Sequence, residues 1–212
     1  MTIKHHPSDA TLAAYASGTL DEGRGLVVAT HLSLCTQCRN AAHAFERIGG
    51  AMLDEAEPAA MSPGALQRAM ASLGPLDIVA PAIGGEGGAR DIPAPLSRYA
   101  IGPWRRIGRG VQWRPVEVGS GEGVRVFMLK AAPGTKLPRH RHTGTEWTCV
   151  FEGAFSHQLG RYGAGDFDEA DETVEHDPSV DADMGCVCLV ALQGNIELQG
   201  FFGRLLQPFV RI

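Results

Sequence analysis

Several features that would assign a common class of function are missing from this 212-residue sequence. No apolar run approaches the roughly 20 residues that cross a membrane, and residues 1–7 have no apolar core of a signal peptide. Basic residues number 19 against 24 acidic ones, and a net charge of −5 argues against a general nucleic-acid or anionic-membrane surface. We therefore expect a cytoplasmic protein that binds neither DNA nor a membrane directly.

Cysteine is also scarce, with five residues in the chain, two of which form a C-x2-C pair. The odd number and the close pair favour thiols that bind a metal in a reducing compartment over a disulfide framework. Hydrophobic residues make up 44% of the sequence, which is enough for a real core. The length accommodates two small domains or one larger one.

The first part of the chain has helical periodicity. Ser8 and Asp21 are suited to cap two short helices, and Ser62-Pro63 is suited to start a fourth. A third helix is expected to begin near Cys38. Its apolar residues recur at three- and four-residue intervals and predict one buried face, formed by Ala42, Phe45, Ile48, Met52 and Leu53. The fourth helix would also have one apolar face, formed by Leu66, Ala69, Met70 and Leu73.

The second part of the chain has the pattern of β-structure. Residues 76–97 are rich in glycine and proline and predict a linker. Short runs of β-branched or aromatic residues then alternate with turn residues, which indicates a sandwich or barrel. These runs are Val124–Leu129, Trp147–Phe151, Cys186–Leu192 and Ile196–Phe201. The predicted fold class is α+β, with an all-α domain at 1–75 and an all-β domain at 98–212.

A set of thiolate and imidazole side chains lies in the helical part, as His31-x3-Cys35-x2-Cys38. Residues four apart lie on one helix face, so His31 and Cys35 could aim at one point, to which Cys38 returns. A tetrahedral zinc needs one more ligand, and His5 or His6 is the obvious source. Zinc would hold together helices that are too short to be stable alone. The alternative is a pair of buried thiols beside an incidental histidine.

A second set, of imidazoles and a carboxylate, lies in the β part, as His140-x-His142-x3-Glu146 with His176 further on. Residues two apart on a strand face the same side, so His140 and His142 could both point into a barrel. Glu146 follows a bend at Gly144, and His176 would come from a later strand. This set suits zinc, and also manganese, iron or nickel. The alternative is a pair of surface histidines near a turn.

Residues 1–75 resemble the zinc-binding anti-sigma domain. Two sequence segments account for the resemblance, Tyr15-Ala-Ser-Gly-Thr-Leu20 and His31-Leu-Ser-Leu-Cys35-Thr-Gln-Cys38. The resemblance implies a small helical domain that holds an extracytoplasmic-function sigma factor. It also implies that His6 is the fourth zinc ligand, and that the fourth helix docks on the sigma factor.

Residues 98–212 resemble the cupin family. The stretch Gly134-x5-His140-x-His142-x3-Glu146-x6-Gly153 is similar to the first cupin motif. A degenerate second motif begins at Gly165, and His176 falls where the family has its last metal ligand. The resemblance implies a double-stranded β-helix barrel with a divalent metal held by His140, His142, Glu146 and His176.

The order of the two modules is similar to that of the ChrR family of zinc anti-sigma factors. This implies a regulator of transcription, not an enzyme, that restrains an RpoE-like sigma factor. It also implies release of that factor in an oxidative stress response, when the cupin domain senses singlet oxygen or related oxidants. Two alternatives stay open. One is a metal-dependent cupin dioxygenase or isomerase with a zinc domain for assembly, and the other is an anti-sigma factor whose thiolate zinc site is the redox switch.

Two cysteines of the β part are further candidates for redox chemistry. Cys186 and Cys188 flank Val187 in a predicted strand, so both side chains face one way. On the inward face they would lie near the His/Glu set and could be oxidised, although adjacent same-face positions are poorly placed for a disulfide. The alternative is that both are small hydrophobes of a β core.

Overall fold

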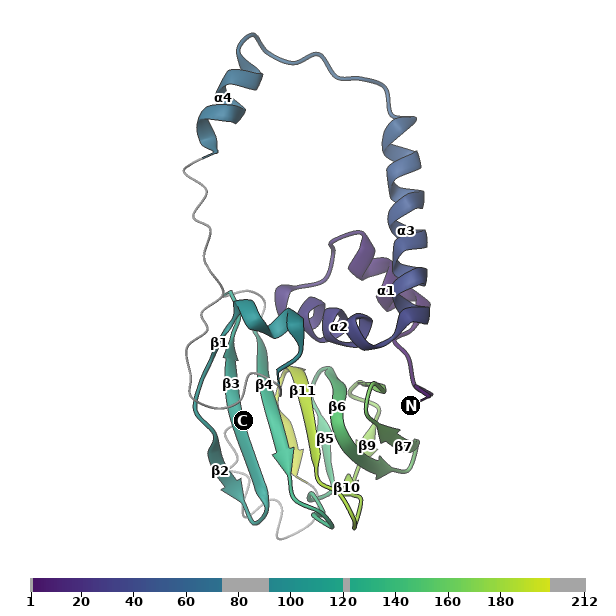
Figure 1. Cartoon of the computed structure of the whole chain (residues 1–212), viewed down its shortest axis with the longest axis vertical. Helices are drawn as coiled ribbons and strands as arrows, with labels where there is room; N and C mark the ends of the chain where they lie inside the picture. The colour runs from purple at the N-terminus through teal and green to yellow at the C-terminus, as the bar shows by residue number, and fades with distance from the viewer. Residues whose placement is uncertain (1, 74–91, 120–122, 199–212) are drawn as a thin grey trace.

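The computed structural model describes residues 2–73, 92–119 and 123–198 (Figure 1). Most of the predicted linker and residues 199–201 of the last predicted strand therefore lie outside the described residues. The helices are α1 (Asp9–Ala16), α2 (Glu22–Leu34), α3 (Thr36–Asp54), α4 (Ala65–Ser72) and the 3-10 helix η1 (Ala94–Arg98). None of the described helices combines the length and the apolar character that a membrane span requires.

Twelve strands follow the helices among the described residues. They are β1 (Ala100–Ile101), β2 (Arg105–Gly108), β3 (Val111–Glu117), β4 (Val124–Ala131), β5 (His140–His142), β6 (Glu146–His157), β7 (Gly160–Gly163), β8 (Phe167–Ala170), β9 (Glu175–His176), β10 (Ser179–Val180), β11 (Cys186–Gln193) and β12 (Ile196–Leu198). A large antiparallel sheet has the order β1-β3-β4-β11-β6-β10, with β2 beside β3 and with β7 and β8 beside β6. A small sheet has the order β12-β5-β9. The predicted α+β fold class, with helices first and strands after them, is confirmed.

The helices begin where capping side chains satisfy their free N–H groups. The Ser8 hydroxyl accepts from the Thr11 N–H at 3.2 Å, and the Asp21 carboxylate accepts from the Arg24 N–H at 2.9 Å, as predicted. The predicted start of the third helix near Cys38 is confirmed, and the predicted start of the fourth at Ser62-Pro63 was two residues early. The third helix begins at Thr36, and the fourth begins at Ala65 after a left-handed glycine that offers no side-chain cap.

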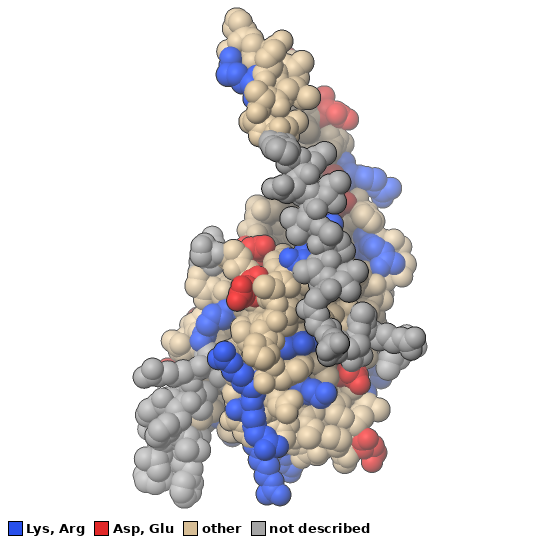
Figure 2. Space-filling view, turned by 60° about the vertical axis from the view of Figure 1, so that its left-hand side comes forward, with Lys and Arg blue, Asp and Glu red and all other residues tan. Residues whose placement is uncertain are grey.

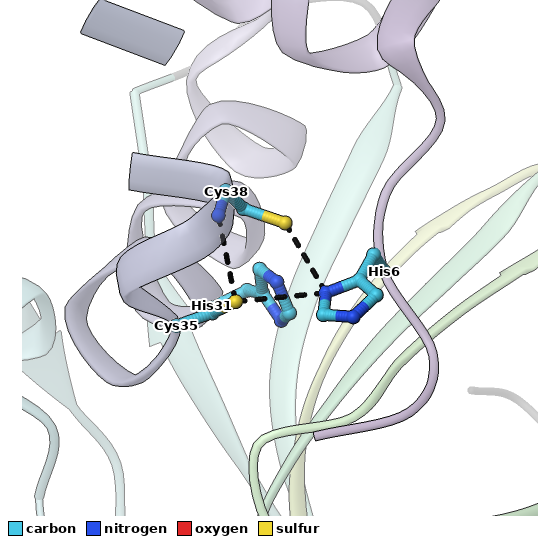
Figure 3. Close-up of side chains that lie close together, drawn as sticks. All are labelled: His6, His31, Cys35 and Cys38. Atoms are coloured by element: carbon cyan, nitrogen blue, oxygen red, sulfur yellow. Dashed lines mark hydrogen bonds between the residues drawn. The ribbon is translucent and has the colours of Figure 1, made fainter. Parts of the chain in front are cut away.

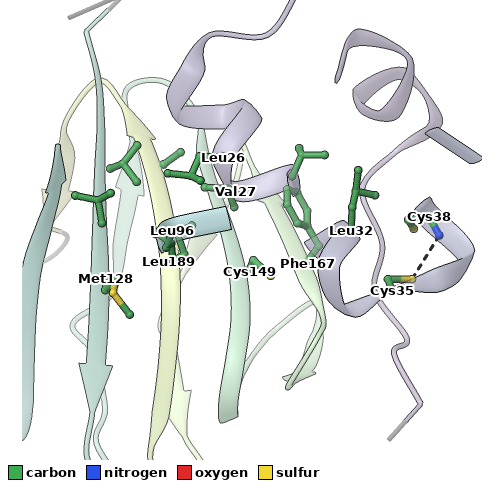
Figure 4. Packing of buried hydrophobic residues seen from close by; sticks show 14 of the residues in the cluster. Leu26, Val27, Leu32, Cys35, Cys38, Leu96, Met128, Cys149, Phe167 and Leu189 are labelled. Atoms are coloured by element: carbon green, nitrogen blue, oxygen red, sulfur yellow. Dashed lines mark hydrogen bonds between the residues drawn. The ribbon is translucent and has the colours of Figure 1, made fainter. Parts of the chain in front are cut away.

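Helix α2 packs directly on the large sheet, and the two parts of the chain share one hydrophobic core (Figure 4). Val27 and Val28 of α2 are fully buried in the same cluster as Leu189 of β11. Leu96 of η1, near the end of the predicted linker, is also fully buried there. Packing therefore fixes α2 and η1 against the sheet.

The predicted buried face of α3 is wrong for its second half. Cys38 and Ala42 are buried, but Ile48, Met52 and Leu53 are 58%, 69% and 75% exposed. The physical reason is that α3 continues past α1 and α2 and projects from the molecule (Figure 1). Helix α4 has no buried residue and stands apart from the other helices and from the sheet. The projecting part has few charges on the face at the top of Figure 2.

Candidate metal centres

The first predicted set, His6, His31, Cys35 and Cys38, comes together where three segments meet (Figure 3). His31 lies in the last turn of α2, and Cys38 lies in the first turn of α3. Cys35 is not in a helix as expected, because α2 ends at Leu34 and Cys35 caps α3 in an extended conformation. His6 reaches the group from the segment before α1. The sequence left His5 or His6 open, and the structure brings His6 into the group.

The distances in this group fit a tetrahedral zinc. The Nδ1 atom of His6 lies 3.5 Å from the Cys35 Sγ and 3.2 Å from the Cys38 Sγ. Bonds of about 2.0–2.3 Å from zinc would separate its ligand atoms by roughly 3.3–3.8 Å, a range that includes the first distance and begins just above the second. All four donor atoms lie within 4.8 Å of one another.

The protonation of the group also fits a metal. The Nε2 atom of His31 is buried and has no hydrogen-bond partner among the described residues, although such atoms are rarely left unpaired. Burial lowers the pKa of His31 to about 4, so the imidazole is neutral and able to bind a cation. Burial, followed by the neighbouring Cys35, raises the pKa of Cys38 to about 12. A divalent cation would supply the charge that makes this thiol ionise.

The second predicted set, His140, His142, Glu146 and His176, also comes together. His140 and His142 are the ends of β5, Glu146 begins β6, and His176 ends β9. The register of the small sheet pairs His140 directly with His176. All three histidines are buried, so the alternative of surface histidines near a turn is wrong.

The geometry of the second set suits one divalent ion. The Nε2 atom of His176 lies 3.0 Å from the Nε2 atoms of both His140 and His142. The Nδ1–H of His140 is placed to donate to the Pro138 carbonyl at 2.7 Å, which leaves Nε2 free as a ligand. A carboxylate oxygen of Glu146 lies 3.8 Å from the Nδ1 atom of His142. Three imidazoles and one carboxylate would complete a tetrahedral zinc, and they would leave two positions open on an octahedral ion such as manganese or iron.

Burial sets the protonation of the second set. Burial, followed by the neighbouring imidazoles, lowers the pKa of His142 to about 4 and of His176 to about 3. Burial, followed by the neighbouring Asp168, raises the pKa of Glu146 to about 8. Without a cation the set is therefore neutral at pH 7, and a metal would bind it with loss of the Glu146 proton.

The second set lies on the wall of an apolar cavity inside the barrel. Phe127, Leu129, Phe155 and Val180 line this cavity together with His140, Glu146 and His176. Cys186 and Cys188 line it as well, so the inward orientation considered for them is the one observed. A hydrogen bond with the Cys186 thiol, followed by burial, raises the pKa of Cys188 well above its usual value, which makes it a poor nucleophile unless its surroundings change. Cys149 lies elsewhere, in the core beneath α2.

Sequence reasoning missed a second group of polar residues beside the barrel set. The Nε2 atom of His157 lies 3.1 Å from a carboxylate oxygen of Asp168, and the His157 ring lies 5.1 Å from the His176 ring. These residues could also hold a cation with His176. The missed signal was the Gly-Asp-Phe-Asp stretch that opens the second motif at Gly165.

Comparison with known proteins agrees with this arrangement. A family model described as a ChrR cupin-like domain matches residues 97–195. The anti-sigma-E factor ChrR of Cereibacter sphaeroides is 42% identical over 218 residues, and the alignment covers 100% of both chains. In the crystal structure of Rhodobacter sphaeroides SigE in complex with the anti-sigma ChrR, the matching chain is 40% identical with a TM-score of 0.73. That match covers 91% of this chain and 100% of the other.

Proposed function

Because the chain belongs to the ChrR family of anti-sigma factors, we propose that it binds and inhibits an extracytoplasmic-function, RpoE-like sigma factor in the cytoplasm. The observation that carries this proposal is the exposed apolar surface of the projecting helices. Met52 of α3 and Met70 of α4 are 69% and 59% exposed. Three leucines of the same helices and of the residue after α4 are exposed by 68% or more, namely Leu53, Leu66 and Leu73. Exposed apolar surface of this extent is typical of a protein-binding site. The solved ChrR relative was crystallised with SigE, which supports the same kind of partner here.

In this proposal, zinc at the thiolate site shapes the sigma-binding surface. The four ligands connect the N-terminal segment to the junction of α2 and α3. A metal at that junction would fix the direction in which α3 leaves the molecule, because Cys35 and Cys38 lie at its first turn. The direction of α3 decides where its exposed apolar face, including Met52, meets a partner.

We further propose that the barrel binds a second divalent metal and senses singlet oxygen or a related oxidant. Histidines and cysteines line the apolar cavity together, and a cysteine thiol can be oxidised stepwise to sulfenic and higher acids. A change at Cys188 would alter the packing of β11, one of the strands that support α2. Because α2 also carries the proposed zinc ligand His31, such a change would alter the position of that ligand in the anti-sigma domain.

The proposed function needs no catalytic turnover, and we assign no reaction to the chain. The His/Glu set would also support a dioxygenase or an isomerase. The named full-length relative is an anti-sigma factor, however, and that favours the regulatory function.

Inhibition is tested by transcription in vitro with RNA polymerase and the most SigE-like sigma factor of the source genome. Addition of the full chain is expected to abolish transcription that depends on this sigma factor and to leave transcription by the housekeeping sigma factor unchanged. Equal transcription with and without the chain would refute the proposal.

The sensing site is tested by two single variants in the same assay. His142→Ala removes a barrel ligand, and Cys35→Ser removes a thiolate ligand. If the barrel is the sensor, His142→Ala still inhibits transcription but no longer releases the sigma factor under a photosensitiser and light. A normal light response of His142→Ala, with a lost response in a partly inhibiting Cys35→Ser variant, would instead identify the thiolate site as the switch.

A further inference from the structure

One turn of the barrel holds the segment that carries the zinc ligand His6. Asp166, in the turn between β7 and β8, is only 4% exposed. One of its carboxylate oxygens accepts from the main-chain N–H groups of Lys4 at 2.6 Å and His5 at 3.0 Å. The next residue, Phe167, donates its N–H to the His5 carbonyl at 3.1 Å. The position of His6 is thus fixed by hydrogen bonds to the residues immediately before it.

The same turn orients a second zinc ligand. The Nδ1 atom of His31 lies 2.8 Å from the Gly165 carbonyl oxygen, which can only accept. His31 must therefore carry its proton on Nδ1 and present Nε2, the buried atom without a partner, to the thiolate group. The Phe167 ring packs edge-on against the His31 imidazole, with ring centroids 5.6 Å apart. Fixed tautomer and ring orientation are what outer-shell groups give to metal-binding histidines.

The turn itself is rigid. The second carboxylate oxygen of Asp166 accepts from the Gly163 N–H at 2.7 Å, and the Asp166 N–H donates to the Gly163 carbonyl at 2.9 Å. Gly165 has a φ of +91°, and a Cβ atom there would lie 2.6 Å from the Ile3 side chain. Any other residue would therefore shift the carbonyl that meets His31.

We propose that the Gly165 carbonyl and the Asp166 carboxylate of the barrel are positioning groups of the thiolate metal site, which makes the barrel part of the outer shell of the anti-sigma domain's metal. The inference rests on the proposed zinc at His6, His31, Cys35 and Cys38. The barrel would then influence that metal directly, through the hydrogen bonds of Gly165 and Asp166 and without the sigma-binding helices.

The test is metal binding by the full-length chain with Asp166→Asn. An asparagine amide has one acceptor oxygen in place of two, so either the Lys4 and His5 N–H groups or the Gly163 N–H loses its partner. The affinity of the thiolate site is expected to fall about 10- to 100-fold, the usual effect of an outer-shell change. The measurement is competition with a chromophoric chelator, using Co²⁺, whose thiolate charge-transfer band reports the cysteine site alone.

The matched control is Asp181→Asn. Asp181 accepts from the Nε of Arg161 at 3.0 Å and from its Nη2 at 2.6 Å, and it lies in the same barrel. A second variant, Gly165→Ala, moves the carbonyl without changing charge. The inference is supported if Asp166→Asn and Gly165→Ala weaken only the thiolate site, while the barrel metal and the thermal midpoint stay close to those of Asp181→Asn.

The inference is wrong if Asp166→Asn binds Co²⁺ at the thiolate site as tightly as the parent chain. It is also wrong if Asp166→Asn loses both metals equally, since that outcome indicates general unfolding. A parent chain with no thiolate charge-transfer band would instead refute the zinc site of the proposed function, and the two failures are therefore distinguishable.

Discussion

At the scale of single residues, burial acts in opposite directions on the two kinds of ligand. The imidazoles of His31, His142 and His176 have lowered pKa values and are neutral at pH 7 without a metal. Glu146 and Cys38 have raised pKa values and are protonated at pH 7 without a metal. A metal that binds either set therefore finds imidazoles that are already deprotonated, but it must displace protons from the acidic ligands.

This difference predicts proton release at the barrel site. With the thiolate site already loaded, zinc binding at pH 7 is expected to release nearly one proton from Glu146, because the carboxyl is protonated below its pKa of about 8. The release should fall toward zero above pH 8, where the free carboxylate is already ionised. Calorimetry in buffers of different ionisation enthalpy measures the number of protons.

The control for this prediction is Glu146→Gln, which has no proton to lose. It should release none from this position and should bind zinc more weakly. Equal proton release from the parent chain and from Glu146→Gln would show that another group titrates.

At this scale the sequence was a good guide to the metal sets and a poor one to their surroundings. Spacing and motif predicted His31, Cys35, His140 and His142 as ligands. Residues that are close in the sequence of one helix or strand have a fixed relative geometry, so their spacing is informative. Asp166 was missed, since its role depends on contact with His5, 161 residues away in the chain. No local pattern encodes such a contact.

At the scale of elements, the close approach of α2 to the sheet depends on one glycine. A Cβ atom on Gly23 would lie 2.8 Å from the Val126 Cγ2 and 2.9 Å from the Val124 Cγ1, both on β4. Gly23→Ala is therefore expected to push α2 away from β4 and to lower the free energy of unfolding by about 1–3 kcal/mol. Denaturant unfolding of the full chain measures the change.

Two residues further on, Gly25 offers a matched control. A Cβ atom there meets nothing within 4 Å, so Gly25→Ala should raise the free energy of unfolding by up to about 1 kcal/mol through helix propensity alone. If both substitutions changed stability in the same direction, close packing at Gly23 would not be what seats α2.

The helices illustrate what periodicity can predict. Capping residues located the first two helix starts, because an N-cap is a local hydrogen bond to the next turn. The apolar stripes of α3 and α4 were also real, but periodicity does not say what covers them. The stripe of α3 is covered by α1 only at its beginning, and its end at Met52 is exposed.

At the scale of the whole molecule, the two candidate metal-ligand sets are connected by packing. His5 stacks on Tyr162 with ring centroids 4.2 Å apart, and Tyr162 stacks on His157 at 4.9 Å. The His157 ring in turn lies beside the ring of His176, a member of the barrel set, with ring centroids 5.1 Å apart. A row of rings thus leads from the barrel set to the residue next to His6. The sequence suggested domains joined by a linker, and it could not show this interface because every contact in it joins distant segments.

The central claim is that the projecting apolar face of α3 and α4 binds a sigma factor. Its most direct test is the dissociation constant between the full chain and the most SigE-like sigma factor of its genome, measured for Met52→Lys, Met70→Lys and the control Met184→Lys. Met184 is 46% exposed and lies on the barrel. We expect Met52→Lys and Met70→Lys each to weaken binding about 10-fold or more, because each would bury an unpaired charge, and Met184→Lys to bind like the parent. Parent-like binding by all three variants, or no binding by the parent, would contradict the account.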